Sequence, residues 1–204
     1  MKKLGLVGGM GVESTIPYYH DIVYGVQNKI GKKFFPNITI ESVNAFDVLG
    51  LCSEQKYDEL TDYLMQAIKN LTTSGADFIA LSANTPHIVF DRLQNKSTVP
   101  LVSIVEATRN EAIRLNKHKL GLLGTIFTMT EDFFKKPFYN SNIEIITPTT
   151  EEMEYINLEL SIDLKDYLNK YSGLKYQINY SILIERLSDA DIANKYGVSR
   201  QYVY

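Results

Sequence analysis

The fold of this chain is decided near its N-terminus by residues 4–15, which read LGLVGGMGVEST. The apolar run Leu4–Val7 stops at the glycine-rich segment Gly8–Gly11, and polar residues suited to a helix start come next. A strand, a glycine turn and a helix in this order are typical of parallel α/β proteins. In such proteins the turn and the helix N-terminus present backbone N–H groups to a ligand.

The same alternation of strand and helix continues outward from this segment. Apolar or β-branched runs predict strands at 38–43, 77–81, 101–104, 120–123 and 143–146, and helical spacing predicts helices at 57–71, 86–93, 105–115 and 127–138. This alternation predicts a parallel sheet with both faces covered. We expect an α/β fold of two similar lobes with parallel sheets flanked by helices, followed by a helical C-terminal segment. A single doubly wound sheet fits the same periodicity.

The predicted domains are a first α/β lobe at 1–98, a second α/β lobe at 99–164 and a divergent helical tail at 165–204. The end of the tail, residues 187–204, resembles a helix-turn-helix fragment, because Gly197 stands where the turn between two capped helices needs a glycine. The segment is short and nearly neutral, so we expect no nucleic-acid binding from it.

Composition and charge narrow the possible partners. The chain has 204 residues and a formal net charge of −3, so no global positive field attracts nucleic acid or an anionic membrane surface. No apolar run approaches the ~20 residues of a membrane span, and the first apolar run is too short for a signal peptide. The one cysteine, Cys52, forms no internal disulfide. We expect a cytoplasmic protein that binds a small molecule, with no membrane contact.

The glycine turn does not match the nucleotide-binding motifs. Gly9 and Gly11 fit the dinucleotide fingerprint, but Ser14 occupies its last glycine position, and no Gly-Lys-Ser/Thr follows for a phosphate-binding loop. The hydroxyls of Ser14 and Thr15 at the helix start favour a smaller anion, such as a carboxylate.

The candidate ligand-binding residues follow the predicted strands, since ligands of parallel sheets gather at the carboxyl ends of strands. They are Gly8, Gly9 and Met10 after the first strand, Asn84 and Thr85 after the third, and Thr125 and Thr128 in the second half. Together they predict one pocket between the lobes that holds a carboxylate or an amine. In the alternative interpretation Asn84 and the hydroxyls only cap helices, and His87 is a buried imidazole with satisfied hydrogen bonds.

Several motifs taken in order resemble the aspartate/glutamate racemase family. They are LVGGMGVEST at 6–15 with Tyr18 and Tyr19, Ser42-Val43-Asn44 leading to Phe46, ANTPH at 83–87, LLGT-x-FTM at 122–129, and Pro148-Thr149 followed by 151–156. The resemblance runs from about residue 2 to about residue 164 and is specific when the motifs are taken together.

The resemblance implies an amino-acid racemase of two similar α/β lobes with the active site between them. Such enzymes use neither pyridoxal phosphate nor a metal, and we expect no cofactor here. Racemisation removes the α-proton from one face of an amino acid and returns one to the other face, so it needs two opposed acid/base groups. Backbone amides and hydroxyls hold the α-carboxylate in the family. We expect Asn44 to be a further substrate-binding residue, and we expect the residues that select the side chain to lie near Asn44 and Phe46.

Two departures from the family pattern concern these acid/base groups. Family members place one cysteine directly before the Asn-Thr pair, where this chain has Ala83, and another in a Gly-Cys-Thr-Glu segment that this sequence does not contain. Cys52 matches neither position and is expected to be an ordinary loop thiol. We therefore expect no intact catalytic residue and a possible pseudoenzyme. The alternatives are a catalytically silent protein that binds amino acids or carboxylates, and a regulator that contacts DNA.

The divergent tail also predicts a homodimer. In the family a late strand and helix complete the second lobe, and without them apolar sheet surface would face water at a cost of ~25 cal/mol per Å². The helical residues at 150–187 or a second subunit would cover that surface, and we expect a second subunit.

Overall fold

The computed structural model describes residues 2–161 and divides them into two compact units. Unit 1 comprises residues 2–116 and 131–141, and unit 2 comprises residues 117–130 and 142–161. The predicted helical pattern beyond residue 161 and the helix-turn-helix-like segment lie outside the described residues.

The described chain alternates strands and helices. Unit 1 contains β1 (Leu4–Gly8), α1 (Val12–Ile30), β2 (Ile38–Ser42), α2 (Ala45–Ser53), α3 (Tyr57–Thr73), β3 (Phe78–Leu81), the 3-10 helix η1 (Thr85–Val89), α4 (Phe90–Lys96), β4 (Leu101–Val102), α5 (Ile104–Arg114) and the 3-10 helix η2 (Lys136–Phe138). Unit 2 contains β5 (Lys119–Gly121), α6 (Ile126–Thr130), β6 (Glu144–Ile146) and α7 (Thr150–Ser161). The predicted α/β fold with a parallel sheet flanked by helices is confirmed.

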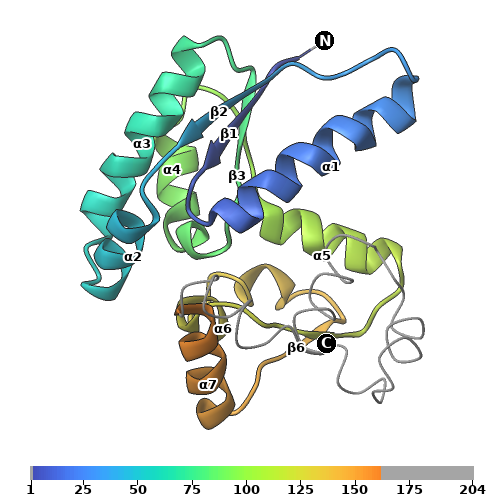
Figure 1. Ribbon diagram of the computed structural model, residues 1–204. Helices are drawn as coiled ribbons and strands as arrows, with labels where there is room; N and C mark the ends of the chain where they lie inside the picture. Colours follow the sequence, from blue (N-terminus) through green and yellow to red (C-terminus); the bar gives the residue numbers. More distant parts are fainter. Residues whose placement is uncertain (1, 162–204) are drawn as a thin grey trace. The chain divides into compact units, whose positions relative to one another are not determined.

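Unit 1 is built on a parallel sheet of strand order β2-β1-β3-β4 (Figure 1). The central strand β1 pairs with both neighbours in register, so that Leu4 lies opposite Ile38 on one side and Phe78 on the other. Every residue of β1 is buried, because a strand in the middle of a parallel sheet is covered on both faces. The carboxyl ends of β1, β2 and β3 therefore lie at the same edge of the sheet.

Helices cover both faces of this sheet, with α3 on one side and α1 on the other (Figure 1). On the α1 side, Tyr18 and Ile22 pack against the cluster of Leu4, Leu6 and Ala80. On the α3 side the sheet and the helix approach closely. A Cβ on Gly5 would lie only 3.2 Å from the Cβ of Leu71 in α3. These layers fix the turns that connect the strands to α1, α2 and η1.

Unit 2 has a smaller core around the parallel pair β5 and β6, in which Lys119 lies opposite Glu144. Its buried apolar side chains are Leu122, Met129, Ile143 and Met153. The strands themselves are mostly exposed or half-buried, so within the described residues unit 2 hides much less apolar surface than unit 1.

The compact units differ from the boundary expected at residue 98. Strand β4 pairs with β3, with Ile79 opposite Leu101, so β4 and the α5 that follows it belong to the first unit. Residues 131–141 return to unit 1, where the Arg109 guanidinium on α5 donates a hydrogen bond to the carbonyl of Pro137 at 3.2 Å. Contacts between segments that are distant in the sequence decide where the two units divide. The local pattern does not show these contacts.

Two local elements also differ from the expectation. The helix predicted at 127–138 is replaced by the short α6 and the 3-10 turn η2, with no regular helix between them. No helix is predicted between the strand at 38–43 and the helix at 57–71, but α2 lies there, and its buried residues Val48 and Cys52 stand one helical turn apart. That spacing, together with the cap residue Asn44, is the local signal for this helix.

The described residues contain neither a candidate membrane span nor a candidate metal cluster. No helix among residues 2–161 combines the length and apolar character that crossing a bilayer requires. No group of three or more His, Cys, Asp or Glu side chains in the same range is arranged to hold a metal ion.

Candidate functional site at the carboxyl edge of unit 1

The turns after β1 and β2 are in direct contact. Gly9 has a φ of +82°, and a Cβ added to it would lie 2.2 Å from the carbonyl oxygen of Val43 and 2.5 Å from the Oγ of Ser42. Only glycine combines this backbone conformation with this close approach. The backbone N–H of Val43 also donates to the carbonyl of Gly8 at 2.9 Å, so the two turns are held together.

A cluster of three hydroxyls ties the turn after β1 to the end of β3. Thr15 Oγ1 accepts from the backbone N–H of Gly9 at 3.0 Å and lies 3.1 Å from Ser82 Oγ. Ser14 Oγ donates to the carbonyl of Ser82 at 2.9 Å. Ser82 is fully buried and its hydroxyl donates to the carbonyl of Val7 at 3.2 Å. The glycine turn is thereby held rigidly over the sheet.

These hydrogen bonds change which groups at the start of α1 are available to bind an anion. The hydroxyls of Ser14 and Thr15, expected to favour an anion, are engaged within the protein. The backbone N–H groups of Met10 and Gly11 have no hydrogen-bond partner among residues 2–161. They lie beside the N-terminus of α1, whose dipole favours a negative charge. The donors offered to an anion are therefore amides and not hydroxyls.

Asn44 begins α2, and its contacts are internal. Its Oδ1 accepts from the backbone N–H of Phe46 at 3.0 Å, and its own backbone N–H donates to the hydroxyl of Tyr63 at 3.1 Å. The same hydroxyl donates to Asp47 Oδ2 at 3.3 Å. Tyr63, in the middle of α3, was not among the sequence candidates, because nothing local connects it to a turn far earlier in the chain.

The segment after β3 presents Ala83, Asn84 and Thr85. Asn84 stands at the N-terminus of η1, yet its side chain does not cap the helix and has no hydrogen-bond partner among residues 2–161. Its side chain is half-buried, whereas Thr85 and the following Pro86 are buried. An amide side chain offers donors and an acceptor, so Asn84 is equipped to bind a polar ligand. The alternative interpretation, a helix-capping Asn84, is wrong.

His87 is a structural residue. It is buried, its Nδ1 lies 3.0 Å from the carbonyl of Ala83, and its Nε2 accepts from the backbone N–H of Ile104 at 3.3 Å. Because Nε2 must accept, the proton is on Nδ1 and the ring is neutral. Burial lowers the pKa of His87 to about 4. The imidazole therefore links the segment after β3 to α5 and is not a base open to a ligand.

This burial predicts a pH-dependent stability. The pKa of His87 is about 4 in the folded protein and about 6.5 in an unfolded chain. Between these values the unfolded state binds the extra proton, so the contribution of His87 to stability is full above pH 6.5 and falls by roughly 3 kcal/mol as the pH falls to 4. Urea unfolding followed by circular dichroism from pH 4 to 7.5 measures this loss.

The variant His87→Asn isolates the histidine's part in that pH dependence. Asparagine retains an amide donor for the Ala83 carbonyl but does not titrate. The loss of stability between pH 6.5 and 4 is therefore expected to be smaller in this variant by roughly 3 kcal/mol, the part assigned to His87. Replacement of the exposed His118 by asparagine serves as the control and leaves the slope unchanged. An unchanged slope in His87→Asn contradicts the assignment.

Cys52 lies inside α2 and is completely buried, so the expectation of a loop thiol is wrong. Burial raises the pKa of its thiol to about 11. The group is therefore protonated at neutral pH, and it is not exposed to any ligand. It does not act as a base for an α-proton.

Thr125 and Thr128 belong to unit 2, and their hydroxyls lie 3.2 Å apart. Thr128 is buried and its backbone N–H donates to Thr125 Oγ1 at 3.4 Å. Thr125 thus stabilises the start of the short helix α6. The shared pocket of these threonines with Gly8, Asn84 and Thr85 remains a prediction.

Comparisons with known proteins point to one family. Residues 7–173 match the family model described as Asp/Glu/hydantoin racemase. The chain is 29% identical over 156 residues to the broad specificity amino-acid racemase RacX of Bacillus subtilis (strain 168), which covers 70% of this chain. It is similar to the crystal structure of a putative Asp/Glu racemase from Yersinia pestis, with a TM-score of 0.75 and 30% identity, covering 91% of this chain and 82% of that one.

An aspartate racemase homologue from Pyrococcus horikoshii OT3 is also similar. Its TM-score is 0.70 and its identity 34%, and the match covers 89% of this chain and 80% of that one. The chain spans 63% of the length of RacX, which is less than two thirds of that relative.

Proposed function

Since the chain belongs to the Asp/Glu/hydantoin racemase family, we propose that it binds an amino acid at the carboxyl edge of β1, β2 and β3. In this proposal the α-carboxylate is held by the amides of Met10 and Gly11 and by the side chain of Asn84. Ala83 supplies no proton carrier, so the protein acts as an amino-acid-binding member of the family.

The side chain of Asn84 carries the proposal. It is half-buried at an edge where the turn after β3 is tied by hydroxyls to the turn after β1, and no described residue accepts or donates a hydrogen bond to it. A polar group in such a position forfeits hydrogen-bond energy unless a ligand or water provides the partner. An α-carboxylate would meet that amide and the two backbone N–H groups together.

The neighbouring groups of unit 1 do not replace the missing proton carrier. The methyl group of Ala83 neither donates nor accepts a proton. His87, whose ring bonds to the carbonyl of Ala83, is neutral and has both nitrogens occupied. Cys52 is buried and its raised pKa keeps the thiol protonated. Binding is therefore supported by these residues, whereas thiol-based proton transfer at position 83 is not.

A second candidate is an amino-acid racemase that uses proton carriers other than a thiol at position 83. The 29% identity to RacX favours it. This candidate and the first share the binding site and differ only in whether the bound amino acid loses its α-proton.

Isothermal titration calorimetry and hydrogen exchange test the two candidates together. We expect heat of binding with at least one amino acid from a panel of both enantiomers. We expect no incorporation of deuterium at Cα when the protein and that amino acid are held in deuterated water. Absence of binding to the whole panel removes the proposal. Deuterium incorporation by the unmodified protein shifts the assignment to the racemase.

The variant Asn84→Ala tests the binding site directly. Loss of a hydrogen bond to a charged carboxylate is expected to weaken amino-acid affinity by about ten-fold or more. Asn95→Ala, at an exposed position on α4, is the matched control and leaves affinity unchanged. Equal affinities of Asn84→Ala and the unmodified protein in calorimetry would place the ligand elsewhere.

The remaining expectations concern partners and location. We propose a homodimer in the cytoplasm, which light scattering of the purified protein and fractionation of cells test. The binding described above uses only groups of this chain and needs no cofactor. The DNA-contacting alternative rests on residues outside the described range, and gel retardation tests it.

A further inference from the structure

Three segments of unit 1 form the proposed binding edge, and their charged side chains are acidic. The segments that form it, residues 8–15, 42–49 and 82–87, contain no lysine or arginine. Their carboxylates are Glu13 and Asp47, in the first turns of α1 and α2. A second carboxylate on a bound amino acid would therefore meet negative charge and no compensating cation from these segments.

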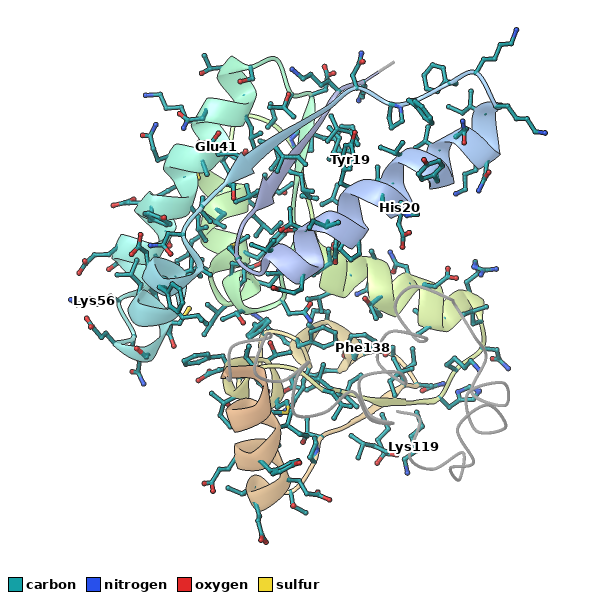
Figure 2. All side chains as sticks on the ribbon, in the orientation of Figure 1. Tyr19, His20, Glu41, Lys56, Lys119 and Phe138 are labelled. Carbon is teal, nitrogen blue, oxygen red and sulfur yellow. The ribbon has the colours of Figure 1, made fainter. Side chains whose placement is uncertain are left out.

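Lys56 is the first lysine or arginine after β2, and Arg92 is the first after β3. Each forms an ion pair with a carboxylate. Lys56 Nζ lies 2.7 Å from Glu54 at the outer end of α2 (Figure 2), and Arg92 Nη1 lies 2.6 Å from Asp58. Both cations are thus engaged by carboxylates that lie outside the three segments. Within residues 8–15, 42–49 and 82–87 the carboxylates of Glu13 and Asp47 are therefore not balanced by a lysine or an arginine.

Exposed apolar side chains lie at the same helix starts. Phe46, the second residue of α2, is 83% exposed, and Val12, the first residue of α1, is 58% exposed. Leaving a phenylalanine ring in water forgoes roughly 1.5–3 kcal/mol of burial energy. Each of these side chains stands in the first turn of a helix, Val12 directly after the Met10 and Gly11 amides and Phe46 three residues after Val43, which Gly9 approaches closely.

Hydrogen bonds hold the backbone at Phe46. Its backbone N–H donates to Asn44 Oδ1, and Asn44 is held in turn by Tyr63, whose hydroxyl also binds Asp47. The turn before it touches Gly9 through Val43. The ring and the Asp47 carboxylate are therefore attached to a rigid element next to the glycine turn.

From these observations we propose that the site takes an amino acid with an uncharged, apolar side chain and discriminates against aspartate and glutamate. Phe46 contacts the apolar side chain, and Asp47 repels a second carboxylate. This inference rests on the proposed function and names its substrate class.

Calorimetry at fixed ionic strength tests the substrate class, with leucine, methionine and phenylalanine compared against aspartate and glutamate, each as both enantiomers. We expect the apolar amino acids to bind at least about ten-fold more tightly. Tighter binding of aspartate or glutamate, weakened by Asn84→Ala, overturns this inference and leaves the proposed function standing. If no amino acid binds, the proposed function itself fails.

Two variants assign the discrimination to residues. Asp47→Asn removes one charge and is expected to strengthen glutamate binding by about five-fold with little effect on leucine. Asp77→Asn, at the opposite edge of the sheet, is the control and leaves glutamate binding unchanged, since an amide oxygen still accepts from the Lys3 backbone N–H. Equal glutamate affinities of Asp47→Asn and Asp77→Asn contradict the role of Asp47.

Phe46→Ala is expected to weaken leucine binding by about ten-fold, and Phe46→Leu to retain most of the affinity. Thermal unfolding of both variants verifies that they fold. If Phe46→Ala leaves leucine affinity intact but changes the mass measured by light scattering, the ring belongs to a contact between subunits and the inference is overturned.

Discussion

Replacement of Gly9 by alanine is expected to destabilise the protein by roughly 2–5 kcal/mol. The backbone of Gly9 has a positive φ of +82°, and the new Cβ would lie 2.2 Å from the carbonyl oxygen of Val43. Backbone atoms, unlike the end of a flexible side chain, do not move away without separating β1 from β2. The midpoint of urea unfolding, followed by circular dichroism, measures the effect.

Gly25→Ala is the matched control for this prediction. Gly25 lies inside α1, and a Cβ there meets no atom within 4 Å. Alanine is the better helix former, so Gly25→Ala is expected to stabilise the protein by about 0.5–1 kcal/mol. If Gly9→Ala unfolds at the same urea concentration as the unmodified protein, the close contact between the two turns is incorrect.

The variant Ala83→Cys is expected to introduce exchange of the α-proton. A thiol at position 83 would stand between the buried Ser82 and Asn84, to which we assign ligand binding, at the position that the family resemblance gives to a cysteine. A positioned acid/base group accelerates proton transfer by about 10²-fold or more. Deuterium incorporation at Cα of a bound amino acid, followed by mass spectrometry, is the measurement. One thiol suffices for exchange, whereas inversion requires a second group on the opposite face.

Ala83→Ser is the control for the introduced thiol. A serine hydroxyl is of similar size but remains protonated at neutral pH, so it is expected to give no exchange above the unmodified protein. Exchange that is equally fast in all three proteins would show that proton transfer does not depend on position 83. Binding with no exchange in Ala83→Cys would contradict the proposed place of the amino acid.

Much of the fold could be predicted from local patterns. The strand, turn and helix at residues 4–15 and the helical spacing at 57–71 agree with β1, α1 and α3. The helix α2 was missed, although Asn44 and the spacing of Val48 and Cys52 indicated it. Periodicity detects a helix well when the apolar face is long, and less well over two turns.

Local sequence patterns indicate which residues are candidates for the site, but they do not show which of these residues contact one another. Gly9, Met10 and Asn84 are candidates because they follow strands, which is a local property of the sequence. The engagement of Ser14 with Ser82, separated by 68 residues, depends on which strands are neighbours. The same is true of Tyr63 and Asn44.

The sequence by itself determined that this chain is a parallel α/β protein, which residues stand at the strand ends, and that alanine occupies position 83. Each of these follows from short-range order along the chain. Only the tertiary structure decided which polar groups are consumed by internal hydrogen bonds and which remain for a ligand, and that His87 and Cys52 are buried and inactive as bases. Hydrogen-bond pairing and desolvation depend on neighbours in space, and strand order brings those neighbours together from distant parts of the chain.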